Sequence, residues 1–218
     1  MITTKNLAYW YDNADEKLFE DINLQFDAGK LYAIIGKSGS GKTTFLSLIA
    51  GLDTPKSGSI EFEDEPLKKI GLMNYRKKCV SMVFQSYNLL TYMSALDNLL
   101  CAMAITGAKH AGDRKYALEL LDRIGIDEDN AKRKVTKLSG GQQQRVAIAR
   151  TMCCDSRFVV ADEPTGNLDE SSTEDVLELF QQIAHEQNKC VVIVTHEFDV
   201  AQKCDSIIEL RQKKFEQV

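Results

Sequence analysis

Runs of apolar residues predict strands in the first and last parts of the chain. Some runs alternate with polar residues, as in a half-exposed strand, and others are continuous, as in a buried strand of a parallel sheet. They occupy residues 2–8, 19–26, 31–35, 59–63, 77–84, 157–162 and 190–194. A polar turn at residues 12–16 separates the first two. Both ends of the chain are therefore expected to be rich in β-structure.

Helical spacing replaces this pattern between residues 86 and 154. Its segments are 95–105, 114–124 and 141–152. Helical patterns also occur before this segment, at 45–50, and after it, in a helix that runs to about His185, where Ser171 and Glu174 have the spacing of a capping box. The order predicts a single α/β domain over residues 1–218. Its core and β subdomain comprise about 1–85 and 155–218, and a helical subdomain is inserted at about 86–154.

A glycine-rich loop lies between the run 31–35 and the helical pattern 45–50. Its residues are Gly36, Lys37, Ser38, Gly39, Ser40, Gly41, Lys42 and Thr43. They fit G-x-x-x-x-G-K-[ST] in a strand–loop–helix context, where glycines let backbone N–H groups surround a phosphate beside a helix N-terminus. Lys42 is placed to contact the β- and γ-phosphates, and the Thr43 hydroxyl to ligate Mg²⁺. A Gly/Ser-rich surface turn can match this pattern by chance, but the predicted strand before the loop and the predicted helix after it favour nucleotide binding.

Two adjacent acids, Asp162 and Glu163, stand at the end of the run 157–162, and Pro164 stops the strand. Consecutive strand residues point to opposite faces, so the two carboxylates are expected to serve different tasks. Asp162 suits the water shell of Mg²⁺, and Glu163 is placed to polarise an attacking water. The alternative is a strand that simply stops at a polar loop.

Gln85 and His196 follow two other predicted strands. Ligands of open parallel sheets gather at the carboxyl ends of strands. Gln85 is therefore expected to reach the metal or its water, and His196 to hydrogen-bond a terminal phosphate. A solvated or capping amide is the alternative interpretation of Gln85.

Two further features are compatible with nucleotide binding. The last helix of the middle segment opens with Ser139, Gly140, Gly141 and Gln142. Its glycines give access to backbone donors, and Ser139 supplies a hydroxyl and an N-cap, although a flexible helix start has the same composition. Tyr11 is the last of three consecutive aromatics. It is predicted from its position in the motif order to stack on adenine, with core or edge packing as the alternative.

The composition of the chain argues against some classes of function. The 218 residues are 44% apolar and include 3 prolines, which suits one folded domain or one with a small insert. The net charge of −5 gives no general attraction to nucleic acid or anionic lipid. None of the 6 cysteines forms a C-x-x-C pair, so buried free thiols are expected. No signal-like segment and no apolar run of roughly 18 residues is present, so we expect a cytosolic chain that does not insert into a membrane directly.

Taken together, the motifs make the chain resemble the nucleotide-binding domain of ABC transporters over nearly its whole length. The corresponding elements are the Walker A loop 36–43, the Q-loop Gln85, the signature 138–142, the Walker B strand 158–162, the D-loop 167–169 and the switch His196. The resemblance implies an α/β fold of the P-loop NTPase type, with a RecA-like core, an N-terminal antiparallel β subdomain and an inserted α-helical subdomain. Small departures are Thr44 in place of the commoner serine, and Gln143 and Gln144, which extend the signature before Arg145.

The resemblance also implies an ATPase that uses ATP and Mg²⁺. Its expected catalytic residues are Lys42, Gln85, Glu163 and His196. The expected metal residues are Thr43, Gln85 and Asp162. Nucleotide contacts are expected from Tyr11, from the loop 36–43 with Thr44, from 139–142 and from Asp169.

Residues 161–169 resemble, within the family, the ATPases of macrolide-exporter, lipoprotein-release and antimicrobial-peptide transport systems. This implies that ATP hydrolysis powers export or mechanotransmission by separate permease subunits, with the chain peripheral on the inner face of the membrane. It also implies a head-to-tail homodimer, in which ATP lies between the Walker A loop of one subunit and 139–141 of the other. The expected groove for a permease coupling helix, or alternatively ordinary subdomain core, comprises Tyr87, Leu89, Leu90, Tyr92 and Met93.

Two other classes of function compete with transport. Soluble ABC-type ATPases of DNA repair carry a long coiled-coil insert, and those of translation carry two ATPase domains with a basic linker; this sequence shows neither. An assembly, signalling or resistance-sensing module that hydrolyses little ATP is compatible with the composition and stays open.

Overall fold

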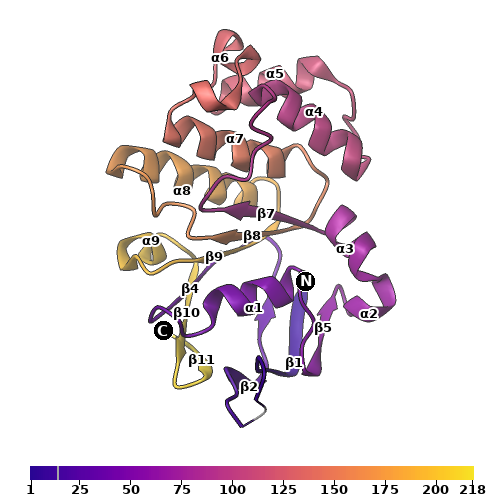
Figure 1. The fold of residues 1–218 in the computed structure, drawn as a ribbon, viewed down its shortest axis with the longest axis vertical. Coiled ribbons are helices and arrows are strands. Elements are labelled where there is room, and N and C mark those ends of the chain that lie inside the picture. The colour runs from indigo at the N-terminus through magenta and orange to yellow at the C-terminus, as the bar shows by residue number, and fades with distance from the viewer. Residues whose placement is uncertain (14) are drawn as a thin grey trace.

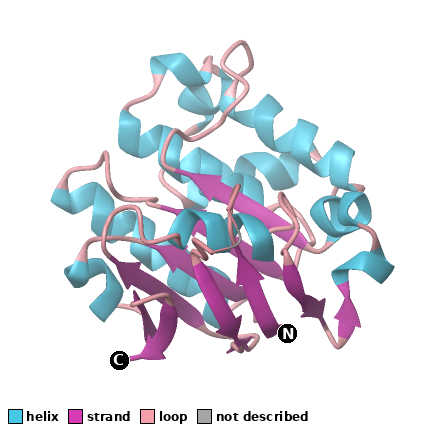
Figure 2. Ribbon diagram, turned by 60° about the horizontal axis from the view of Figure 1, so that its bottom comes forward, coloured by secondary structure: helices cyan, strands magenta, loops and turns pink. Residues whose placement is uncertain are grey.

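The computed structural model describes residues 1–13 and 15–218. It contains two sheets and several helices (Figure 2), and the helices within residues 95–185 lie together at the top of Figure 1. The polar turn predicted at residues 12–16 includes Ala14, which lies outside the described residues.

The smaller sheet is antiparallel and has the strand order β2-β1-β5-β6, with β3 also paired to β1. Its strands are β1 (Ile2–Tyr9), β2 (Phe19–Ile22), β3 (Gln25–Phe26), β5 (Ser57–Phe62) and β6 (Glu65–Pro66). The single strand predicted at 19–26 is therefore wrong, because it is divided in two. Thr4 explains the break: its hydroxyl donates to the Ile22 carbonyl at 3.0 Å and accepts from the Leu24 N–H at 2.9 Å, so a side chain replaces regular pairing there.

The larger sheet has the order β11-β10-β4-β9-β8-β7 and is parallel except for β11. Its strands are β4 (Leu31–Gly36), β7 (Val80–Phe84), β8 (Phe158–Asp162), β9 (Cys190–Val194), β10 (Ser206–Arg211) and β11 (Lys214–Gln217). The register pairs Phe84 with Asp162, Asp162 with Val194 and Val194 with Ile34. The carboxyl ends of β4, β9, β8 and β7 therefore lie in one row.

The two faces of this sheet belong to different hydrophobic cores. On one face, Val159, Ala161, Val191 and Ile193 pack with α7 (Gly140–Met152) and α8 (Glu170–His185). On the other face, Phe158, Val160, Cys190 and Val192 pack with α1 (Lys42–Ile49) and with residues of the antiparallel sheet. Strict alternation along β8 and β9 thus buries both faces, as expected for parallel strands covered on two sides.

The segment between β7 and β8 contains α4 (Ala95–Thr106), α5 (Arg114–Arg123), α6 (Glu128–Lys132), a 3-10 turn (Val135–Lys137) and α7. The three helices predicted there are confirmed to within about one residue at each end. The short α6 was not predicted. Elsewhere, α2 (Leu67–Ile70), α3 (Leu72–Lys78) and α9 (Phe198–Gln202) are also short.

Two local predictions are wrong. The strand predicted at 77–84 begins only at Val80, because the preceding residues form α3. Tyr75 anchors that helix: the side chain is fully buried, and its hydroxyl donates to the Ile49 carbonyl at 2.7 Å. The predicted capping box at Ser171 and Glu174 is also absent from the described residues, since α8 begins at Glu170, two residues before the start that a Ser171 cap would give.

Asp169 is the actual N-cap of α8. Its carboxylate accepts the Ser172 N–H at 2.8 Å and the Ser171 hydroxyl at 2.9 Å. The backbone bond from Ser172, followed by the hydroxyl bonds, lowers the pKa of Asp169. Glu174 instead accepts from Lys203 at 3.1 Å. An Asp two residues before the predicted cap therefore determines the start of the helix.

The cysteines are free thiols throughout the described residues. Cys153, Cys154 and Cys190 are buried as expected, but Cys79, Cys101 and Cys204 are only partly buried. In residues 1–13 and 15–218, no helix combines the length and the apolar character that a membrane span requires.

The anchoring of α3 is testable. Tyr75→Phe should lower the free energy of unfolding by about 1 kcal/mol, because the buried Ile49 carbonyl loses its donor while the ring packing is kept. Met73→Ala, on the exposed face of the same helix, should change it by less than about 0.5 kcal/mol. Urea unfolding followed by circular dichroism measures both, and equal effects would contradict this explanation of α3.

Candidate functional site

The loop between β4 and α1 has the backbone geometry of a phosphate cradle. Gly36 has φ 149°, and a Cβ there would lie 2.7 Å from the Leu210 carbonyl oxygen. Gly41 has φ 108°, and a Cβ there would lie 2.7 Å from the Leu18 side chain. Both positions need glycine, for conformation and for space.

Polar groups in this loop have few partners from the protein. Lys42 is 7% exposed, and its ammonium donates to the Gly36 carbonyl at 2.8 Å and the Lys37 carbonyl at 3.2 Å. Among the described residues, no side chain caps α1, and the buried Ser40 hydroxyl has no hydrogen-bond partner. A helix N-terminus, a cation and an unpartnered hydroxyl at one loop suit an oxyanion ligand.

Beside the loop is a pocket of about 160 Å³. It is lined by Tyr11, Leu18, Gly39, Gly41, Lys42, Thr43 and Thr44. Tyr11 is 61% exposed, its hydroxyl lies 2.6 Å from the Thr44 hydroxyl, and its ring packs edge-on against Tyr9 at 5.4 Å. The pocket therefore joins the predicted stacking ring to the predicted phosphate loop. Leu18 was not predicted, because a lone leucine in a polar segment gives no signal.

Asp162 and Thr43 form a polar pair at the end of β8. The Thr43 hydroxyl donates to Asp162 Oδ1 at 3.2 Å. Burial raises the pKa of Asp162, the nearby Glu163 acts in the same direction, and the Thr43 bond and Lys42 oppose them. A hydroxyl and a partly desolvated carboxylate are oxygen ligands that suit Mg²⁺, whose charge would favour the ionised carboxylate.

Gln85 follows β7 at the same sheet edge, but its amide faces the D-loop. Its Nε2 donates to Asn167 Oδ1 at 3.4 Å, and Asn167 Nδ2 donates to the Gln85 carbonyl at 3.4 Å. The Thr43–Asp162 pair is not among its hydrogen-bond partners in the described residues. Asn167 was predicted only as part of the D-loop, and its pairing with Gln85 was missed.

Glu163 and His196 form a second pair. His196 Nδ1 lies 2.8 Å from Glu163 Oε2, and the His196 backbone N–H donates to the same oxygen at 3.3 Å. The side chain of Glu163 is 19% exposed and that of His196 64% exposed. Glu163 has φ 46°, and its N–H donates to the Val194 carbonyl at 2.9 Å. The adjacent acids thus have different partners, Thr43 for Asp162 and His196 for Glu163.

The signature segment lies elsewhere in the same chain. Ser139 caps α7 in a capping box: its hydroxyl accepts the Gln142 N–H at 3.2 Å, and Gln142 Oε1 accepts the Ser139 N–H at 2.9 Å. Ser139 is exposed. Among the residues that the structure describes, none from 138–142 lines the pocket beside the phosphate loop, and Asp169 is engaged in capping α8.

Comparison with known proteins agrees with these motifs. The family model described as "ABC transporter" matches residues 19–166. The uncharacterized ABC transporter ATP-binding protein YclH of Bacillus subtilis is 51% identical over 215 residues, which cover 99% of this chain and 95% of that protein. The lipoprotein-releasing system ATP-binding protein LolD of Rickettsia typhi is 38% identical over 203 residues, covering 93% of this chain and 90% of LolD.

A solved structure shares the fold. The ATP-binding cassette MJ0796, in a dimeric post-hydrolysis state bound to ADP and Pi, has a TM-score of 0.86 and 33% identity, with 100% of this chain and 98% of that chain covered. The predicted P-loop NTPase fold and the kinship with lipoprotein-release ATPases are thereby confirmed. The chain therefore belongs to the ABC transporter family, as one of its ATP-binding, ATP-hydrolysing proteins.

Proposed function

We propose that this chain hydrolyses Mg²⁺-bound ATP as one half of a head-to-tail homodimer, and that it thereby drives separate membrane permeases in export or mechanotransmission. The observation that carries the proposal is the row of strand ends, where Lys42, the Thr43–Asp162 pair and the Glu163–His196 pair follow neighbouring strands. An anion site, a candidate metal site and a candidate base at one sheet edge suit phosphoryl transfer to water.

The loop residues 36–43 and Thr44 would hold the phosphates. The fit rests on the unpartnered Ser40 hydroxyl, the space that a Cβ at Gly36 or Gly41 would fill, and the uncapped start of α1 among the described residues. Lys42 would exchange its bonds to loop carbonyls for bonds to phosphate oxygens. The exposed Tyr11 ring, held by Tyr9 and Thr44, would stack on adenine.

Mg²⁺ would be held by Thr43 and Asp162, and Gln85 would join them or their water after releasing Asn167. Bound Mg²⁺ would neutralise charge that develops on the phosphates. Glu163 would accept a proton from the attacking water at Oε1, because Oε2 is engaged by His196. The His196 ring would keep that carboxylate oriented and reach the terminal phosphate.

Dimerisation would complete the site. Ser139, Gly140, Gly141 and Gln142 begin α7 and lie away from the pocket of their own chain. The hydroxyl of Ser139 and the positive end of α7 would meet the ATP of a second copy, with Asp169 at the same interface. The dimeric structures of MJ0796 support a dimer as the assembly.

Glu163→Gln tests the mechanism and the assembly together. The substitution keeps the side-chain size but removes the base, so ATP hydrolysis should fall by at least about 10²-fold while ATP still binds. Persisting ATP should hold two subunits together, so light scattering should report a dimer with ATP and a monomer with ADP.

Two variants complete that experiment. Adding Ser139→Arg to Glu163→Gln should abolish the ATP-dependent dimer, because a bulky cation would fill the space meant for the partner's phosphate. Glu186→Gln, at an exposed acid beyond α8, should hydrolyse ATP like the parent protein. Fast ATP hydrolysis by Glu163→Gln would show that Glu163 is not the catalytic base.

The permease would dock on a groove along β7. The groove has a volume of about 360 Å³ and lies between the strand, α3, α4 and α7. Its lining includes Leu52, Met82, Phe84, Ile105 and Arg150, and Ile105 is 63% exposed. An apolar groove of this kind suits one face of an amphipathic helix. Docking there would place the chain on the inner face of the membrane without inserting it.

The residues predicted for this groove do not line it. Leu89 is buried in the helical core and Tyr87 packs against that core, as in the alternative interpretation, whereas Tyr92 is 67% exposed. Arg150 connects the two regions, because its guanidinium donates to the Tyr87 carbonyl at 3.2 Å and also to the Asn88 carbonyl. The predicted segment is therefore hydrogen-bonded to a residue that lines the groove.

Ile105→Glu should abolish copurification of a membrane-spanning partner with the tagged chain from native membranes, since a charge would enter the apolar groove. Val218→Glu, at an exposed residue away from the groove, should leave copurification intact. Thermal unfolding would verify that both variants are folded. A partner set without membrane-spanning proteins would instead favour the assembly or signalling alternative.

A further inference from the structure

Gln144 is a buried polar residue that the ATP site described above does not use. It lies in the second turn of α7 and is fully buried. Its Nε2 donates to the Pro164 carbonyl at 2.7 Å, whereas its Oε1 is buried and has no hydrogen-bond partner in the described part of the chain. A half-satisfied buried amide is costly for stability, so its presence calls for a role beyond packing.

Pro164 directly follows Glu163, so the bond reaches the backbone that carries the proposed base. Proline has no N–H, and its carbonyl is therefore the one backbone group through which this residue can be held. The turn around it is fixed from other sides as well. The Glu163 N–H donates to the Val194 carbonyl at 2.9 Å, and the Thr165 hydroxyl donates to Glu197 at 2.9 Å. Gln144 supplies the contact from the helical side.

Glu163 needs such support because its backbone is strained. A φ of 46° is uncommon for a residue with a Cβ and persists when the surrounding structure holds it. Its carboxylate must also keep its 2.8 Å contact with His196. A small rotation at 163–164 would displace the carboxylate, since the side chain projects from the strained residue.

We propose that Gln144 is a positioning residue that couples the start of α7 to the orientation of Glu163. The proposal rests on the proposed function, in which Ser139 at the start of this helix meets the ATP of the partner. Ser139 and Gln144 lie on one rigid helix. A shift of α7 when that ATP is engaged would be transmitted through the Gln144 amide to the Pro164 carbonyl, and so to the carboxylate next to it.

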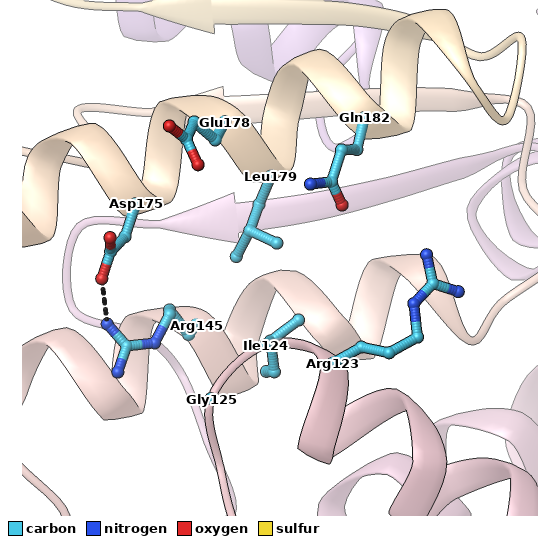
Figure 3. Close-up of a pocket in the computed structure, with 8 residues that line it drawn as sticks. All are labelled: Arg123, Ile124, Gly125, Arg145, Asp175, Glu178, Leu179 and Gln182. Carbon is cyan, nitrogen blue, oxygen red and sulfur yellow. Dashed lines mark hydrogen bonds and ion pairs between the residues drawn. The ribbon is translucent and has the colours of Figure 1, made fainter.

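A neighbouring contact provides the matched control. Arg145 Nη1 lies 2.8 Å from Asp175 Oδ2 and joins α7 to α8 beside a cavity of about 240 Å³ (Figure 3). The cavity is also lined by Arg123, Ile124, Gly125, Glu178, Leu179 and Gln182. Asp175 bonds α7 at Arg145, the residue after Gln144, and among the described residues it makes no hydrogen bond to the turn 163–166. Loss of this ion pair should weaken the contact between α7 and α8 without breaking the hydrogen bond from Gln144 to Pro164.

The test compares Gln144→Met, Gln144→Glu and Asp175→Asn in steady-state ATPase assays with Mg²⁺ and ATP. Gln144→Met removes the donor at similar volume, so kcat should fall about tenfold, as for loss of one hydrogen bond that acts in the transition state, while KM stays within about twofold. Asp175→Asn should change kcat by less than about twofold, since the Asp175 carboxylate is 58% exposed and such ion pairs contribute little.

Gln144→Glu adds a readout that simple packing would not produce. Burial raises the pKa of a carboxyl group, and only the protonated form can donate to the Pro164 carbonyl. The kcat of Gln144→Glu relative to the parent should therefore rise as the pH falls from about 8 to about 6, whereas the ratio for Gln144→Met should stay flat. This pH response remains measurable even if Gln144→Met folds poorly.

The proposal is overturned if Gln144→Met keeps the parental kcat, if Asp175→Asn loses as much kcat as Gln144→Met, or if the Gln144→Glu ratio is flat with pH. Glu163→Gln in the same assay separates this inference from the proposed function. If Glu163→Gln is inactive and Gln144→Met is normal, only the positioning role fails. If Glu163→Gln is fully active, the proposed base itself is wrong.

Discussion

The register of the parallel sheet is the constraint on which the candidate site depends. Ile34, Val194, Asp162 and Phe84 are neighbours across four strands, so whatever follows each strand emerges at the same edge. Those continuations are the phosphate loop, His196, Glu163 and Gln85, which are widely separated in the sequence. A slip of one residue in any pairing would send alternate side chains to the wrong core, and the two-sided burial of β8 and β9 prevents that slip.

The charged and polar groups at this edge are hydrogen-bonded to neutral groups of the protein. Lys42 bonds loop carbonyls, Gln85 bonds Asn167, and Asp162 bonds Thr43 while burial raises its pKa. In each case a phosphate or a cation would replace the present neutral partner with a charged one, which gives a stronger contact. The differences in strength would supply binding energy, and the proposed movement of Gln85 would follow from the same exchange.

Sequence patterns predicted the parts of this arrangement that are encoded locally. The strands β8 and β9 and the helices α4, α5 and α7 are continuous apolar or periodic segments, so their limits could be read closely. Contacts between residues that are far apart in the sequence could not be predicted in this way. Thr4 divides the segment 19–26, and Tyr75 keeps 72–78 helical through Ile49. The pairs Gln85–Asn167 and Gln144–Pro164 likewise depend on the folded register.

The central claim is that one catalytic site is built from two copies of this chain, and a mixing experiment tests it most directly. Lys42→Ala lacks the phosphate cation and Ser139→Arg blocks the signature, so neither variant alone should hydrolyse ATP. A mixed dimer contains one site in which Lys42 and Ser139 are both intact, contributed by different chains. Mixing the two inactive variants should therefore restore part of the ATPase activity. Activity in the mixture no greater than the sum of the separate variants would contradict a site shared between subunits.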